Sequence, residues 1–216
     1  MSFTPENFEQ TAAVYTNLLQ EIKFRVEAID LILEERIALR GKIAEELCFL
    51  QLRMICESIA LGCLTMHGDI GIGYEDLRKS YKASFIIKKL ERWNPKFYPR
   101  PLEATDDHTS TVPGWVELEG EFLTSGDLIA LWERHSGEKL HRGTAKALSF
   151  EGAPKFDEIK KWRDKVVQLL TRHTISSPDA EQIYYFIMND GNGKIAGNLF
   201  QKLDEDEARL VQSRNV

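Results

Sequence analysis

The chain has 216 residues and a mass of 24.8 kDa, the size of one ordinary domain or of one domain with a small appendage. Apolar residues make up 43% and charged residues 29%, so we expect a folded core rather than disorder. The formal net charge of -6 argues against a protein that coats nucleic acid without sequence preference, because such proteins are normally basic.

Five helices are predicted from apolar side chains that recur at three- and four-residue steps. The second is apolar nearly all round, and a helix without a polar face belongs in the middle of a fold. Gly68 directly follows it, as expected at a helix C-terminus. We expect the helices over residues 5–35, 42–67, 74–92, 126–140 and 155–173.

Two segments indicate β-structure. Residues 94–122 hold four of the seven prolines and read as an irregular surface connection, with one short strand expected around Trp115 to Glu119. Residues 183–188 are rich in β-branched and aromatic side chains, 189–193 form a turn cluster, and 194–200 can return as a partner strand. A lone hairpin is marginally stable, so it must pack on the helices, pair with the strand near 116, or pair with another chain.

The expected fold class is therefore mainly α (α+β). We predict a bundle of about five helices around a buried central helix in residues 1–175, a small C-terminal β-hairpin appendage in 181–202, and an acidic tail in 203–216.

The expected compartment is the cytoplasm. The N-terminal residues lack the cationic stretch and apolar run of a signal peptide. Residues 47–66 are about as long as a membrane span, but Arg53 and Glu57 lie near the middle, where each costs about 2.5–3.5 kcal/mol in lipid. A buried helix of a soluble bundle fits better, and no membrane partner is expected.

The three cysteines, Cys48, Cys56 and Cys63, lie on nearly one face of that helix, where they cannot easily reach one another. Three cysteines in this arrangement do not form a set of disulfide bonds. This favours a reducing compartment. Because no CxxC or HxxxH spacing accompanies them, we expect buried small side chains rather than a metal site, and we predict no cofactor.

Arg53 and Glu57 lie one turn apart on the central helix, where opposite charges can pair. Burying two charges is costly unless they are paired and hydrogen-bonded. One interpretation is a polar ligand-binding site inside the bundle. The other is a structural ion pair, or an arginine that reaches the bundle edge.

A second candidate site lies at the end of the fourth predicted helix, where Arg134 and His141 are separated by six residues and His135 is a polar neighbour. This pattern resembles the signature of the HEPN superfamily, small helical bundles that include many metal-independent ribonucleases of toxin and antiviral systems. The resemblance implies a composite site between two protomers. His141 would move the proton of the ribose 2′-OH or of the leaving oxygen, and Arg134 would hold the phosphate. His135 or Glu138 would orient the imidazole.

The alternative for this segment is structural. Gly137 interrupts the helix that should carry the signature, so it can instead end the helix and leave His141 as a loop or packing residue.

A second resemblance covers residues 45–172. The runs 46–57, 59–62, 87–91 and 94–99, with Leu140-His141, look like those of a group of bacterial proteins for which no activity is implied.

The function expected from these observations is a cytoplasmic bacterial interaction or assembly protein, of a defence or toxin–antitoxin type. Its expected partner is a second copy of the chain or another protein. The alternatives are a HEPN-like ribonuclease that uses Arg134 and His141, with RNA as the partner, and a small-ligand site at Arg53 and Glu57.

Overall fold

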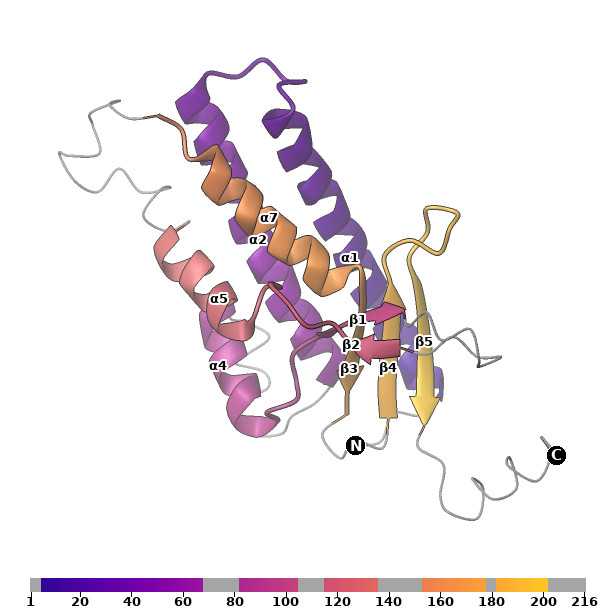
Figure 1. The fold of residues 1–216 in the computed structure, drawn as a ribbon. Coiled ribbons are helices and arrows are strands. Elements are labelled where there is room, and N and C mark those ends of the chain that lie inside the picture. The colour runs from indigo at the N-terminus through magenta and orange to yellow at the C-terminus, as the bar shows by residue number, and fades with distance from the viewer. Residues whose placement is uncertain (1–4, 68–81, 105–114, 136–152, 178–181, 202–216) are drawn as a thin grey trace, which may run out of the picture.

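The fold was analysed in a computed structural model, which describes residues 5–67, 82–104, 115–135, 153–177 and 182–201. In this part of the chain, five α-helices and one short π-helix pack against an antiparallel sheet (Figure 1). The helices are α1 (Pro5–Leu33), α2 (Gly41–His67), α4 (Ala83–Trp93), α5 (Ser125–Ala130), η1 (Leu131–His135, the π-helix) and α7 (Phe156–Leu170). The strands are β1 (Arg100–Ala104), β2 (Trp115–Glu117), β3 (Arg172–Ser176), β4 (Gln182–Ile187) and β5 (Ala196–Gln201).

Helix α2 is the centre of the fold, as its all-round apolar sequence predicts. It runs beside α1 and also packs against α4, η1 and α7 (Figure 1). Leu52, Ile55 and Cys56 are completely shielded from solvent. Within the described residues, α2 is long and apolar enough to cross a membrane, and 61% of that apolar stretch is buried inside the protein. The core helix of a soluble protein has the same properties.

A close approach between α1 and α2 depends on a glycine. A Cβ atom at Gly62 would lie 2.7 Å from Cε2 of Tyr15 and 3.0 Å from its Cδ2. The missing side chain therefore makes the space in which the Tyr15 ring lies against α2.

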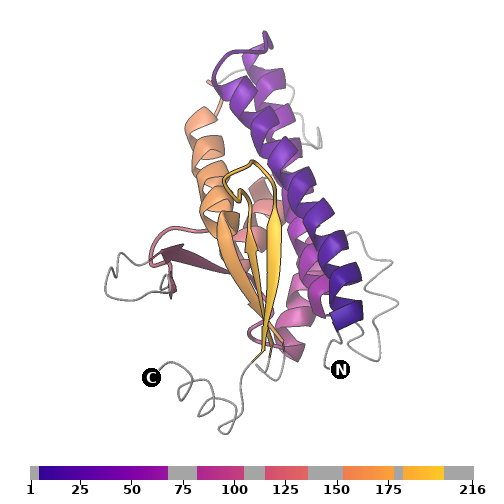
Figure 2. The same ribbon diagram turned by 90° about the vertical axis from the view of Figure 1, so that its right-hand side faces the viewer.

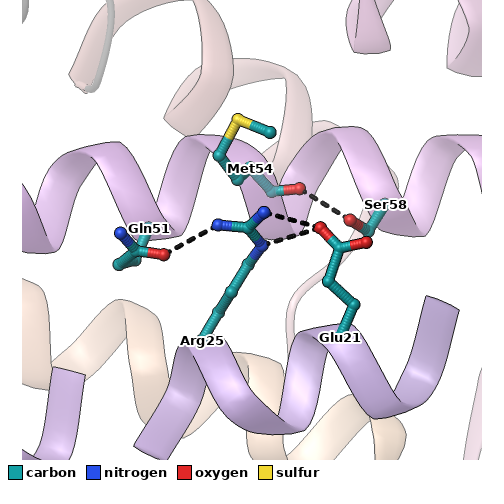
Figure 3. A network of polar contacts seen from close by, with 5 residues as sticks. All are labelled: Glu21, Arg25, Gln51, Met54 and Ser58. Atoms are coloured by element: carbon teal, nitrogen blue, oxygen red, sulfur yellow. Dashed lines mark hydrogen bonds and ion pairs between the residues drawn. The ribbon is translucent and has the colours of Figure 1, made fainter. Parts of the chain in front are cut away.

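Polar contacts also join α1 to its neighbours. Arg25 donates from Nε and Nη2 to Glu21 Oε1 within α1, and from Nη1 to Gln51 Oε1 on α2, at 2.8 Å (Figure 3). On the other side of α1, Arg163 of α7 donates from Nε to Asp30 Oδ1 at 2.6 Å. These contacts set the relative positions of α1, α2 and α7, because each guanidinium binds a partner on a different helix.

The five strands follow the order β2-β1-β3-β4-β5, and every neighbouring pair is antiparallel. Residues alternate between the two faces of the sheet. The inner face, which meets the helices, carries His173, Ile175, Tyr184 and Phe186, all buried. The core is thus shared between the sheet and the helices rather than confined to a bundle.

The predicted hairpin is confirmed, but the prediction of a mainly helical bundle with a small appendage is wrong in its β part. Strands β4 and β5 pair from Gln182↔Gln201 to Ile187↔Ala196. β4 also pairs along β3, so the hairpin forms two strands of a five-stranded sheet. Strand β3 was missed because Thr171 alone separates it from α7, and the helix was expected to continue to 173.

The proline-rich connection 94–122 contains two strands where one was expected. The short strand around 115 is confirmed as β2. The other, β1, contains Pro101, which cannot donate to a neighbouring strand. Pro101 lies opposite His173 in β3 and just outside the β1–β2 pairing, which begins at Leu102. The missing N–H group therefore does not interrupt the β1–β2 pairing. The carbonyl of Pro101 still accepts a hydrogen bond from Leu118 N at 2.9 Å.

The helix predictions agree with the structure over the described residues. Predicted 5–35 and 42–67 correspond to α1 and α2, and predicted 155–173 corresponds to α7 apart from its last residues. Residues 83–92 and 126–130 are helical as expected, and 131–135 form the π-helix. Residues 74–81, 136–140 and the acidic tail lie outside the described residues.

We expect Gly62→Ala to destabilise the protein by about 1–3 kcal/mol, because the new methyl group would overlap the Tyr15 ring. This loss should exceed the gain in helix propensity, about 1 kcal/mol. Urea unfolding followed by circular dichroism measures the difference. Gly126→Ala in α5 is the matched control, since the nearest atom to its Cβ is 3.9 Å away. Equal effects of the two substitutions would contradict the packing argument.

Candidate functional site

Arg53 and Glu57 form a closed cluster with Trp132 of η1. Arg53 Nε lies 3.4 Å from Glu57 Oε1, and the guanidinium carbon lies 4.2 Å from the centre of the Trp132 ring. Trp132 Nε1 donates to Glu57 Oε1 at 2.9 Å, and Arg53 Nη1 donates to the Trp132 carbonyl at 3.3 Å. The ion pair, the cation–π contact and the two hydrogen bonds therefore all connect the same three residues.

These contacts hold η1 against the middle of α2. The Arg53 and Glu57 side chains are each 21% exposed, so they lie at the edge of the core, where charges keep part of their hydration. Their polar atoms are directed at Trp132. The arrangement accounts for two charges on a core helix, while the hypothesis that the pair binds a small ligand stays a prediction.

The π-helix η1 carries the first part of the predicted ribonuclease signature. It continues α5, which starts with a capping box between Thr124 and Asp127. Glu133 pairs with Lys88 of α4 at 3.2 Å, and hydrogen bonds from Ser84 and Lys88 lower its pKa. Arg134 is exposed at the end of this element.

The described residues do not include both members of the Arg134–His141 pair, so the structure does not test their proximity. His135 is the last residue of η1, and His141 lies outside the described residues, as does Glu138. The HEPN-like site therefore stays a prediction.

The three cysteines are free and buried, as expected. Burial raises the pKa of Cys48 to about 11 and raises the pKa values of Cys56 and Cys63 further, so all three are neutral thiols at pH 7. Among the described residues, no group of three or more His, Cys, Asp or Glu side chains could hold a metal ion.

A buried hydrogen-bonded pair joins the helices to the sheet. The Tyr15 hydroxyl lies 2.8 Å from Nε2 of His173, and His173 Nδ1 lies 3.0 Å from the carbonyl of Leu170. A carbonyl can only accept, so Nδ1 carries the proton, and Nε2 accepts from the Tyr15 hydroxyl. Burial lowers the pKa of His173 to about 4, which keeps the ring neutral at pH 7. Because both side chains are buried, this pair has a structural role.

A cleft of about 700 Å³ opens where α1 and α7 meet the β4–β5 hairpin. Its apolar lining comes from all three elements: Ile22, Val26, Val166, Leu170, Ile187 and Met188. Four charged residues also line it: Lys23, Glu27, Arg172 and Asp190. Such a volume and mixture of side chains are typical of small-molecule sites.

No sequence pattern indicated this cleft. Its residues come from three separated segments, and the valines and isoleucines among them are indistinguishable from core residues in a periodicity pattern. Asn189–Gly193, interpreted from the sequence as a turn, is confirmed as the hairpin connection that forms one wall.

Comparisons of the chain with protein-family models, with curated proteins and with solved structures give no match. The resemblances to the HEPN superfamily and to the bacterial group stay predictions. Any functional argument must therefore start from the geometry of the molecule.

We expect Glu57→Ala to destabilise the protein by about 1–3 kcal/mol, because it leaves the buried indole N–H of Trp132 without its acceptor. Glu57→Gln keeps an acceptor oxygen and loses only the charge, so its cost should be below about 1 kcal/mol. Urea unfolding of both variants measures the two costs. If Glu57→Ala unfolds at the wild-type urea concentration, Glu57 does not stabilise the contact between α2 and η1. That outcome would favour the ligand-binding hypothesis.

The free energy of unfolding should fall as the pH is lowered from about 6.5 to about 4. In this range the unfolded chain protonates His173 and the folded chain does not, so protonation favours unfolding. The full loss is about 3 kcal/mol. Burial also lowers the pKa of His67, which adds to the slope with the same sign.

Urea unfolding at several pH values, compared between wild type and His173→Gln, isolates this contribution. The variant should be less stable at pH 7 and should lose less stability on acidification. Parallel pH profiles would show that His173 does not titrate differently in the two states.

Proposed function

We propose that the protein is a cytoplasmic interaction and assembly module that associates with a second copy of itself through strand β5. The observation that carries this proposal is the chemistry of the free edge of β5. In the described part of the chain, β5 has a neighbouring strand on one side only, and in Figure 2 it faces the viewer with no helix in front.

The edge of β5 carries none of the features that usually prevent strand pairing. Its sequence, Ala-Gly-Asn-Leu-Phe-Gln, contains no charge and no proline over six residues. Edge strands of monomeric proteins are normally shortened, charged or interrupted by proline, because their free N–H and C=O groups can otherwise bind another chain.

The opposite edge of the sheet is shorter and carries a charge. Strand β2 has only three residues, and Glu117 at its end pairs with Arg100 at 2.7 Å. One edge is thus protected and the other is open, which supports a single interface at β5 rather than open-ended association through both edges.

The outer face of the sheet beside β5 supports the same interface. Phe200 is 56% exposed, and its partner across the strand pair, Ile183, is 40% exposed. The Tyr185 ring packs edge-on against Phe200, with centroids 6.4 Å apart. Large apolar side chains on an uncovered face are typical of a surface that a protein partner covers.

A second copy fits this edge because antiparallel pairing of a strand with itself obeys twofold symmetry. Such a twofold axis places both outer faces on the same side of one continuous sheet, so the two Phe200–Ile183 patches join. The uncharged edge also keeps like charges out of the contact between two chains that each carry a net charge of -6.

Light scattering coupled to size-exclusion chromatography, from about 1 μM to about 100 μM protein, tests the proposal. Wild type should elute with twice the 24.8 kDa mass of one chain. Asn198→Lys/Phe200→Lys, which places two like charges at the symmetric edge of each copy, should be monomeric with an unchanged circular dichroism spectrum.

Val116→Lys is the matched control, because it places the same charge at an exposed position, 44% accessible, on the opposite edge strand β2. This variant should remain a dimer. A monomeric wild type throughout the concentration range, or a dimeric double variant, would overturn the proposal.

A further inference from the structure

We propose that the cleft between α1, α7 and the β4–β5 hairpin is a binding site for an amphipathic organic anion. The ligand would have an apolar body, of the size of two or three rings or a medium acyl chain, and one acidic head group. This site is separate from the β5 edge and does not depend on self-association.

The apolar body follows from the floor of the cleft. Val26 of α1 and Val167 of α7 line it from the two helices, and Ile187 and Met188 line it from the end of β4 and the residue that follows. Val167 is 37% exposed, so apolar surface remains in contact with water at this position. A ligand that covers it removes that surface from water, and a volume of about 700 Å³ is ample for a molecule of this size.

The negative head group follows from how the charged side chains of the cleft are engaged. Asp190 is held by its own turn, where its Oδ1 accepts from the backbone N–H groups of Asn192 at 2.8 Å and Lys194 at 3.1 Å. Glu27 is exposed, so its charge is hydrated. Both groups stay ionised, but Oδ1 of Asp190 is occupied by its own turn and solvent screens the charge of Glu27 in part.

Lys23 is the cation that can meet the head group of a ligand, and Arg172 lies in the same lining. The Lys23 ammonium uses one of its three N–H groups to donate to the Gly193 carbonyl at 3.0 Å. An anion bound at the other N–H groups would form charge-assisted hydrogen bonds at a half-buried side chain, where such contacts are stronger than in water.

The contact between Lys23 and Gly193 also gives the ligand a way to act on the hairpin. It joins α1 to the connection between β4 and β5, so an anion at Lys23 lies next to the turn that fixes the register of both strands. Ligand binding should therefore reduce the motion of this turn.

The first test uses 1-anilinonaphthalene-8-sulfonate, an aromatic sulfonate, with wild-type protein under native conditions. Its fluorescence should rise with saturable 1:1 binding in the micromolar range. Val167→Trp, which fills the cleft, should weaken binding about tenfold or more. Val14→Trp is the matched control, since Val14 is a 50% exposed valine on α1 that does not line the cleft, and its affinity should equal that of wild type.

The second test separates the head group from the apolar body. Lys23→Met should weaken binding of the sulfonate about fivefold or more, whereas Lys23→Arg should keep it within about twofold. N-phenyl-1-naphthylamine, which has a similar body and no charge, should bind more weakly to wild type and be insensitive to Lys23→Met. Lys161→Met, an exposed lysine of α7 outside the cleft, controls for net charge.

Three results would overturn the proposal. One is the absence of saturable binding of the sulfonate to wild type. Another is an equal loss of affinity in Val167→Trp and Val14→Trp, which would place the probe elsewhere. The third is equal binding of the charged and uncharged probes with equal sensitivity to Lys23→Met, which would show an apolar slot without anion selectivity. Because Asn198→Lys/Phe200→Lys should leave probe binding unchanged, failure here is distinguishable from failure of the dimer.

Discussion

The architecture depends on one constraint, which is that α2 is apolar nearly all round and most of its surface must be covered. Helices α1, α4, η1 and α7 supply this cover. At Gly62 the absence of a side chain lets Tyr15 lie against α2, and the same tyrosine reaches His173 in the sheet. His173 in turn binds the last turn of α7 through the Leu170 carbonyl. One buried set of contacts thus positions α1, α2, α7 and β3, because each member has its partner on a different element.

The same constraint explains the most unusual pair in the sequence. Two charges on a core helix are tolerated when their hydrogen bonds are satisfied locally and part of their surface remains hydrated. Trp132 provides the first condition, since its carbonyl accepts from Arg53 and its indole N–H donates to Glu57, and the 21% exposure of each charged side chain provides the second. The charges of α2 therefore hold the π-helix beside the core. The proposed functions lie elsewhere, at the periphery of the sheet.

The sheet provides two distinct surfaces with different chemistry. Its β5 edge is uncharged and bordered by exposed Phe200, which suits a protein chain whose backbone can pair. The cleft at the other end of the hairpin combines apolar side chains with Lys23 and Arg172, which suits a small anion. Both surfaces include the hairpin, and the Lys23–Gly193 contact ties it to α1.

The sequence by itself determined the helices, the central position of α2 and the β4–β5 hairpin, because each is encoded in local periodicity or turn residues that need no distant partner. Only the tertiary structure decided that His173 and Ile175 form a strand, that Pro101 lies within one, and that the hairpin belongs to a five-stranded sheet. Short strands acquire their hydrogen bonds from segments far along the chain, so no local pattern identifies them. The partnership of Trp132 with Arg53 and Glu57 joins residues 75 or more positions apart, and the cleft joins three separate segments of the chain, so both exist only once the chain has folded.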